Sequence, residues 1–168
     1  MIVVVMGVSG AGKTTVGEAL AMRLGVEFLD ADEFHPPANV AKMKAAMPLT
    51  DDDREPWLAR LNAELEARQE AGKGAVLACS ALKADYRVRL MAGLTAPRLV
   101  FLNGTIEFIR ERMKTRQHKY MPAALLESQF ATLDPPVEAI EIDAALGVAF
   151  AVERIVAVLS TKDPARKP

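Results

Sequence analysis

The stretch GVSGAGKT at residues 7–14 matches the pattern G-x-x-x-x-G-K-[ST] without a gap. It follows a continuous apolar run, Ile2–Met6, and precedes a helical pattern over Lys13–Leu24 that Gly25 ends. Glycines at this spacing allow backbone N–H groups to converge on a phosphate at the N-terminus of a helix. Because the stretch lies between a predicted strand and a predicted helix, we interpret it as a phosphate-binding loop rather than an incidental glycine-rich turn.

Two residues of this loop carry most of its chemistry. Lys13 supplies a positive charge to the outer phosphates of a nucleotide and is a candidate catalytic residue, and the Thr14 hydroxyl can ligate Mg²⁺. The loop residues expected to contact the nucleotide are Gly7, Ser9, Gly10, Ala11, Gly12, Lys13, Thr14 and Thr15. Kinases, hydrolases and switch proteins all use such a loop, so the loop alone does not identify an acceptor.

The rest of the chain alternates between predicted strands and predicted helices. Further strands are expected at Val26–Leu29, Ala75–Cys79, Arg98–Leu102 and Ala139–Ile142. Helices are expected at Asn39–Ala46, Leu82–Met91, Thr105–Lys114, Ala123–Thr132 and Leu146–Leu159, and a further helix is expected to begin with the start signal at residues 48–53 and to end at about Ala71. This alternation predicts a three-layer α/β fold, in which helices cover both faces of a five-stranded parallel sheet.

Length and composition favour one enzyme-sized domain over residues 1–168, with a small lid at about 116–122 and a frayed tail at 161–168. A net charge of −1 argues against nucleic acid and membrane surfaces as partners. The single cysteine, Cys79, excludes an intramolecular disulfide and favours a reducing cytoplasm. The apolar start is too short for a signal peptide or a membrane span, and no other apolar run reaches membrane length.

Two carboxylates, Asp30 and Asp32, follow the second predicted strand at its carboxyl end, where ligands bind in open α/β sheets. On an extended segment, residues i and i+2 point the same way. Asp30 could then organise a metal ion while Asp32 accepts the proton of an acceptor hydroxyl. The alternative is that both are turn or cap residues. His35, which precedes two prolines, either orients a substrate hydroxyl or caps the turn.

Several cations are candidates for binding an anionic acceptor. Arg54 begins a predicted helix after three aspartates, where the alternative is a solvated face with local ion pairs. Ser80, Lys83 and Arg87 follow the third predicted strand, and Arg87 lies one turn after Lys83 on the same face of the predicted helix. These three side chains could therefore converge on a carboxylate or on hydroxyls.

Arg112 and Arg116 are four residues apart and lead into the irregular segment at 117–122. This arrangement suits a lid that brings arginine onto the phosphates as it closes, so both are candidate nucleotide contacts and Arg116 a candidate catalytic residue. The alternative is an exposed basic helix end, which the helix dipole also favours.

Several blocks, in order along the chain, make the sequence resemble the gluconate kinase family. The blocks are residues 7–15 (GVSGAGKTT), 29–36 (LDADEFHP), 39–43 (NVAKM), 48–58 (PLTDDDREPWL), 79–87 (CSALKADYR) and 121–133 (MPAALLESQFATL). They span nearly the whole domain. The DDDR-x-PWL, CSALK-x-x-YR and SQFATL patterns look specific to this family, whereas the phosphate loop does not.

The resemblance implies ATP-dependent, Mg²⁺-assisted phosphorylation of D-gluconate at its 6-hydroxyl, giving 6-phosphogluconate and ADP. It also implies a fold like those of shikimate and nucleoside monophosphate kinases, with a lid. By the same resemblance, Arg54 is a candidate ligand of the substrate carboxylate, and Arg112 and Arg116 are nucleotide and lid contacts. Members of the family are often homodimers, so a small sugar acid and a second copy are the expected partners.

Two other functions are possible interpretations of the sequence. One is a different small-molecule kinase of shikimate-like or nucleoside-kinase type, against which the DDDR and CSALK patterns argue. The other is a nucleotide-binding switch, although the Asn-Lys-x-Asp guanine reader of a GTP switch is absent from the sequence.

Overall fold

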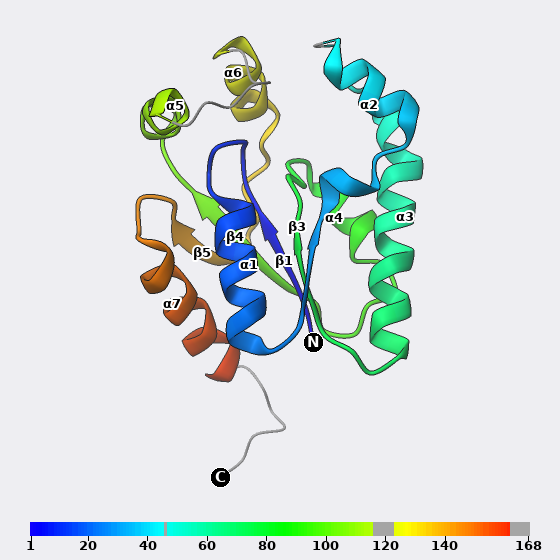
Figure 1. Ribbon diagram of the computed structural model, residues 1–168, viewed down its shortest axis with the longest axis vertical. Coiled ribbons are helices and arrows are strands. Elements are labelled where there is room, and N and C mark those ends of the chain that lie inside the picture. The colour runs from blue at the N-terminus through cyan, green and yellow to red at the C-terminus, as the bar shows by residue number, and fades with distance from the viewer. Residues whose placement is uncertain (46, 116–122, 162–168) are drawn as a thin grey trace.

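The computed structural model describes residues 1–45, 47–115 and 123–161. Its centre is the predicted sheet of five parallel strands, and the structure gives their order as β2-β3-β1-β4-β5 (Figure 1). The strands are β1 (Ile2–Met6), β2 (Glu27–Asp30), β3 (Ala75–Ala78), β4 (Arg98–Asn103) and β5 (Ile140–Asp143). Because all strand pairs are parallel, the carboxyl ends of the strands lie along one edge of the sheet.

Helices cover both faces of the sheet, which confirms the predicted three-layer α/β fold. The helical elements are α1 (Lys13–Leu24), a 3₁₀ helix η1 (Ala31–Phe34), α2 (Pro37–Lys44), α3 (Asp51–Glu70), α4 (Ala84–Leu90), α5 (Ile106–Thr115), α6 (Ala123–Thr132) and α7 (Val148–Thr161). Helices α1 and α7 pack together on one face, and α3 and α4 on the other (Figure 1).

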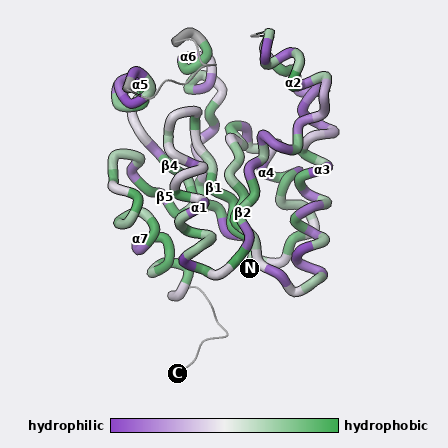
Figure 2. The backbone as a smooth tube through the Cα atoms, viewed as in Figure 1, coloured by the Kyte–Doolittle hydropathy of each residue, from purple (hydrophilic) through white to green (hydrophobic). Residues whose placement is uncertain are grey.

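Strand β1 lies in the middle of the sheet and is buried along its whole length. Its side chains alternate between two hydrophobic clusters, as the period of a strand requires. Val3 and Val5 pack with α1 and α7, whereas Val4 and Met6 pack with α3 and α4. Figure 2 shows the same distribution, with hydrophobic residues along the central strands and hydrophilic stretches on α2 and α3. Because the phosphate loop follows this strand directly, the buried strand holds the first residue of the loop in place.

Local signals set the starts of the helices near the site. The predicted start of α3 is confirmed by a capping box, in which Asp53 N–H donates to Thr50 Oγ1 at 3.2 Å and Thr50 N–H donates to Asp53 Oδ2 at 2.9 Å. Helix α2 begins at Pro37, two residues before the predicted start, because proline suits the first helical position. Helix α4 begins only at Ala84, since Lys83 has an extended backbone.

The predicted lid at 116–122 lies outside the described residues, as do positions 162–168 of the predicted tail. Thr161, where that tail was expected to begin, is instead the last residue of α7. Among the helices of the described ranges, none is long and apolar enough to cross a membrane.

Candidate functional site

The phosphate loop, residues 7–14, joins β1 to α1 in a conformation that depends on glycine. Gly10 and Gly12 have φ angles of 83° and 102°, in the left-handed region that other residues rarely adopt. A Cβ on Gly10 would lie 2.8 Å from Cγ of Met113, and one on Gly12 would lie 3.0 Å from a guanidinium nitrogen of Arg112. Gly12 is the N-cap of α1 and has no side chain to cap the helix, so the first N–H groups of α1 face the loop.

Lys13 and Thr14 lie where the loop becomes α1. The Lys13 ammonium donates to the Val8 carbonyl at 3.1 Å, so it folds back over the loop. Burial lowers the pKa of Lys13, and the nearby Asp32 carboxylate opposes this shift. The Thr14 hydroxyl donates to Oδ2 of Asp30 at 3.2 Å. The structure therefore brings together the two residues predicted to hold Mg²⁺.

The two carboxylates after β2 are arranged differently from the prediction. Asp32 belongs to η1 and not to an extended segment, so Asp30 and Asp32 are not parallel side chains of one strand. Asp30 caps η1 by accepting the backbone N–H of Asp32 at 3.1 Å. The Asp32 side chain is 87% exposed, whereas Asp30 turns toward Thr14. A 3₁₀ helix begins here because an aspartate is a favourable N-cap.

His35 is part of the buried frame behind these carboxylates. Its ring stacks on Trp57 with centroids 4.3 Å apart, and its Nδ1 lies 3.4 Å from the side-chain nitrogen of Asn39. Its Nε2 lies 4.0 Å from Oδ1 of Asp32. Burial lowers the pKa of His35, Arg54 lowers it further, and Asp32 opposes both. The histidine is therefore held neutral between α3 and the Asp32 carboxylate.

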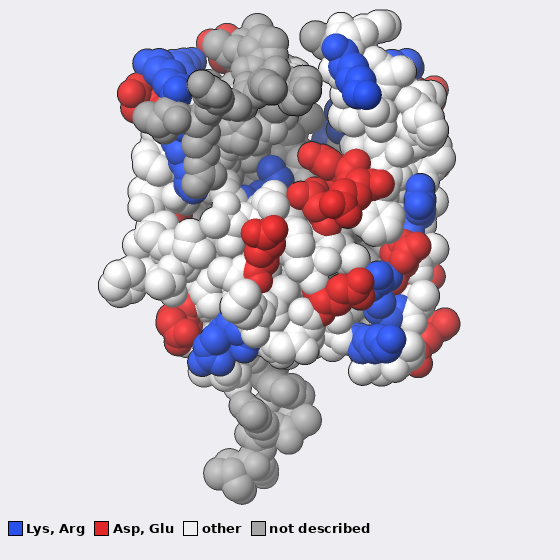
Figure 3. Space-filling model, in the orientation of Figure 1, with Lys and Arg blue, Asp and Glu red and all other residues white. Residues whose placement is uncertain are grey.

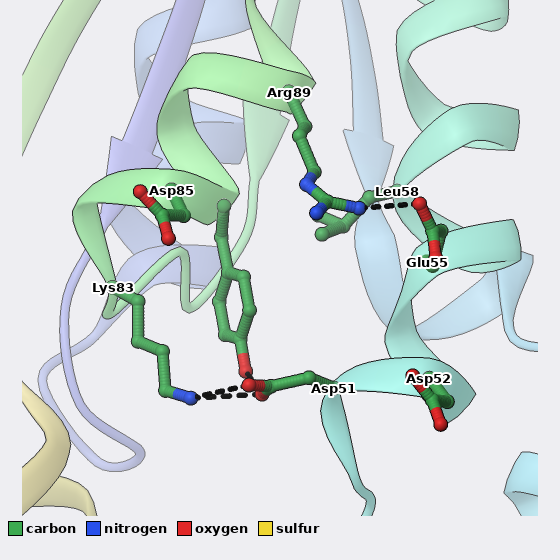
Figure 4. Close-up of a pocket in the computed structure, with 8 residues that line it drawn as sticks. Asp51, Asp52, Glu55, Leu58, Lys83, Asp85 and Arg89 are labelled. Carbon is green, nitrogen blue, oxygen red and sulfur yellow. Dashed lines mark hydrogen bonds and ion pairs between the residues drawn. The ribbon is translucent and has the colours of Figure 1, made fainter.

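Lys83 on the loop before α4 and Tyr86 on α4 face Asp51, the first residue of α3 (Figure 4). The Lys83 ammonium donates to both carboxylate oxygens of Asp51 at 2.8 Å, and the Tyr86 hydroxyl also donates to Asp51. The Arg54 guanidinium lies over the Tyr86 ring, 5.6 Å from its centroid, and donates to the Leu49 carbonyl at 3.4 Å. Two of the predicted acceptor-binding cations thus lie around one tyrosine.

The predicted convergence of Ser80, Lys83 and Arg87 is wrong. Arg87 is buried, and its guanidinium donates to the Ala81 and Leu82 carbonyls at 3.1 and 3.0 Å. The reason is that Lys83 precedes α4, so Lys83 and Arg87 do not share a helical face. Arg87 instead holds the loop after β3. The Ser80 carbonyl accepts the N–H of Gly7 at 3.4 Å, which places Ser80 beside the start of the phosphate loop.

Helices α5 and α6 also contact the phosphate loop, through side chains that are distant from it in the sequence. The Arg112 guanidinium donates to the Ala11 carbonyl at 3.3 Å and to the Ala144 carbonyl at 3.1 Å. Gln129 accepts the Ser9 N–H at 2.7 Å and donates to the Ser9 hydroxyl at 3.1 Å. Gln129 lies in the SQFATL pattern, from which no role for this residue is predicted. Arg116 lies outside the described residues.

The surface around these groups is uneven in charge. Acidic side chains gather over η1 on the face shown in Figure 3. Between α3 and α4 is a cavity of about 110 Å³. Its lining residues are Asp51, Asp52, Glu55, Leu58, Lys83, Asp85, Tyr86 and Arg89 (Figure 4). The phosphate loop follows β1, and Lys83 and Tyr86 come after β3, so both follow strands at the carboxyl edge of the sheet.

Known proteins share both the sequence and this architecture. A family model described as an AAA domain matches residues 2–136. A gluconokinase from Gluconobacter oxydans is 50% identical over 133 residues, covering 79% of this chain and 75% of the relative. The crystal structure of a gluconokinase from Sinorhizobium meliloti matches with a TM-score of 0.86 and 42% identity, over 95% of this chain and 91% of that chain. An unliganded sugar kinase from Janibacter sp. HTCC2649 matches with a TM-score of 0.88 and 43% identity, over 96% of this chain and 95% of that chain.

Proposed function

This chain belongs to the gluconokinase family, and from that premise we propose that it phosphorylates D-gluconate. The reaction transfers the γ-phosphoryl group of ATP to the 6-hydroxyl, and its products are 6-phospho-D-gluconate and ADP. One observation carries the proposal. The phosphate loop, the Thr14–Asp30 pair and a group of cations suited to a carboxylate all lie at the same edge of one sheet.

The proposed cosubstrate and metal are ATP and Mg²⁺. Thr14 and Asp30 present hydroxyl and carboxylate oxygens 3.2 Å apart, and hard oxygen donors are what Mg²⁺ prefers. When bound, Mg²⁺ supplies positive charge that neutralises phosphate oxygens. No cluster of three or more His, Cys, Asp or Glu side chains suited to a metal occurs among the described residues, which fits an ion held largely by phosphates and water.

Three side chains are proposed to act on the reacting groups. Lys13 places its positive charge beside the loop and stabilises negative charge on the phosphoryl group in transfer. Asp32, exposed beside Lys13, accepts the proton of the 6-hydroxyl as that oxygen attacks phosphorus and ADP leaves. Arg112 contacts the nucleotide from α5, and Arg116, which lies outside the described residues, reaches the phosphates from the lid.

The acceptor is proposed to bind between η1, α3 and α4. Arg54 and Lys83 supply positive charge for its carboxylate, because both lie around Tyr86 at the start of α3 and α4. His35 and Ser80 lie nearer to Asp32 and to the loop, and we assign them to the hydroxyl groups. Arg87 supports this site by holding the loop after β3.

We also propose that the enzyme is a homodimer, as the family resemblance implies. Its single cysteine further favours the reducing cytoplasm as its location. Light scattering coupled to size-exclusion chromatography measures the subunit number directly. A molar mass near twice that of the 18.2 kDa chain supports the dimer, and a mass near that of one chain contradicts it.

Product analysis tests the chemistry. The protein is incubated with Mg·ATP and D-gluconate, and the product is examined by mass spectrometry and by phosphorus NMR with proton coupling. The proposal expects one phosphate ester, coupled to the two protons of a primary carbon. A phosphate on a secondary carbon would show that a hydroxyl other than the 6-hydroxyl is phosphorylated. ADP formed without any phosphate ester would show that the protein hydrolyses ATP instead of transferring its phosphoryl group.

A further inference from the structure

The Asp51 carboxylate occupies a ready-made carboxylate-binding arrangement at the start of α3. Lys83 donates to both of its oxygens at 2.8 Å, and the Tyr86 hydroxyl donates to one of them. The Lys83 ammonium also lies 5.3 Å from the centroid of the Tyr86 ring, on which Arg54 packs as well. The Asp51 carboxylate therefore accepts the hydrogen bonds of Lys83 and Tyr86 that the carboxylate of an acceptor would otherwise accept.

Both members of this ion pair are charged at neutral pH. The hydrogen bonds from Lys83 and then from Tyr86 hold the pKa of Asp51 below its usual range, with Arg54 adding a smaller effect. The hydrogen bond to Asp51 raises the pKa of Lys83. Lys83 is consequently a cation whose charge is already neutralised. An incoming acceptor carboxylate meets Lys83 only after Asp51 leaves.

Asp51 can leave without disturbing its helix. The cap of α3 is formed by Thr50 and Asp53, so Asp51 is not needed for it. The Asp51 side chain is 66% exposed and can turn into water, where a carboxylate is well solvated. The cavity of about 110 Å³ between α3 and α4 lies beside the pair and is open to an acceptor group. The exchange therefore costs one exposed ion pair and regains another.

We propose that Lys83 and Tyr86 form the subsite for the acceptor carboxylate, and that Asp51 fills this subsite until the acceptor displaces it. This inference rests on the proposed function and specifies how its acceptor is selected. A carboxylate restores the hydrogen bonds and the charge that Asp51 provided, whereas a neutral hydroxyl restores only part of them. Displacement of Asp51 is therefore balanced only when the acceptor is acidic, so Lys83 and Tyr86 select acidic acceptors over the corresponding neutral polyols.

Steady-state kinetics with Asp51→Asn tests the displacement. Because the variant keeps the size of the side chain and removes its charge, the KM for gluconate is expected to fall ~2- to 5-fold, the range of one exposed ion pair, with kcat unchanged. Asp52→Asn, on the neighbouring exposed acid, is the control for loss of charge at the N-terminus of α3. D-Glucitol lacks the carboxylate and cannot replace Asp51 on Lys83, so its KM is expected to change less in Asp51→Asn than the KM for gluconate does.

Variants of the donors complete the test. Lys83→Met is expected to raise the KM for gluconate ~10-fold or more, and Tyr86→Phe to raise it ~3-fold. In the Lys83→Met background, adding Asp51→Asn is expected to lower the KM for gluconate less than it does in the wild type, because only the Tyr86 hydroxyl is then left for Asp51 to occupy. An Asp51→Asn variant whose KM for gluconate is unchanged or raised overturns the displacement while leaving the kinase intact. A wild-type protein that does not phosphorylate gluconate removes the proposed function itself.

Discussion

Gln129 on α6 makes two hydrogen bonds to Ser9 in the phosphate loop, although the two residues are 120 positions apart in the sequence. Its side-chain oxygen accepts the backbone N–H of Ser9 at 2.7 Å, and its nitrogen donates to the hydroxyl at 3.1 Å. Helix α6 begins directly after the predicted lid segment at 116–122. The contact therefore joins the element that follows the lid to the loop that binds phosphate.

Gln129→Ala is expected to weaken the binding of ATP. The two hydrogen bonds hold Ser9 in place before the nucleotide arrives, and without them the loop must be ordered during binding. At ~1 kcal/mol for each of the two lost bonds, the KM for ATP is expected to rise ~30-fold. Ser128→Ala, on the exposed neighbour in α6, is the matched control and should behave as wild type. A Gln129→Ala variant with an unchanged or lower KM for ATP would show that the contact does not prepare the loop.

Asp32→Asn is expected to lower kcat ~100-fold or more while ATP binding survives. The reason is that the substitution removes the proton acceptor without changing the size of the side chain. Turnover is measured by ADP release, and nucleotide binding by calorimetry. Glu33→Gln changes the charge of the next residue of η1 and serves as the control. Full activity in Asp32→Asn would mean that this carboxylate has no catalytic role.

The folded state is expected to lose stability through His35 as the pH falls. The pKa of His35 lies below its usual 6.5 because burial disfavours the charged ring, so its contribution is complete above pH 6.5. That contribution is lost as the pH falls through the folded-state pKa. Urea unfolding between about pH 7.5 and about pH 5 measures the effect. In His35→Gln this part of the pH dependence should be absent, and an identical slope in both proteins would exclude His35 as its source.

Cys79 is expected to resist thiol reagents in the native protein. It is 1% exposed, and burial raises the pKa of its thiol to about 12, so little reactive thiolate is present at neutral pH. Labelling with an aromatic disulfide should therefore proceed at the rate of unfolding and reach one equivalent in denaturant. The stabilising effect of this buried thiol is present below its usual pKa of 9.0 and declines as the pH rises toward 12. Rapid labelling of the folded protein would contradict this burial.

The fold was predictable because its signals are local. The apolar run Ile2–Met6, the glycines of the loop and the helical pattern that follows identify one strand-loop-helix unit, and repeated alternation supplies the rest. Helix α3 starts within the predicted start signal at residues 48–53, because Thr50 and Asp53 form its cap within four residues of chain. Boundaries that depend on a single backbone angle were less accurate, as at Lys83, where an extended residue delays α4.

The candidate site was predictable only in part, because its contacts join distant segments. Position after a strand was enough to place Thr14, Asp30 and Lys83 at the same edge of the sheet, where Thr14 contacts Asp30. No local pattern indicates that Tyr86 donates to Asp51, or that Gln129 contacts Ser9, since each pair meets only in the folded chain. The family resemblance marked the blocks that contain these residues but assigned no role to Asp51, Tyr86 or Gln129.

The most direct test of the central claim is ADP release with Mg·ATP, measured with D-gluconate beside shikimate, D-glucose, D-glucitol and nucleoside monophosphates. We expect saturable turnover with gluconate, at a kcat/KM far above that for every other acceptor. Preferred turnover of shikimate or a nucleoside monophosphate would contradict the proposed substrate while keeping the phosphotransferase. The absence of acceptor-dependent ADP release with all of them would contradict the kinase itself.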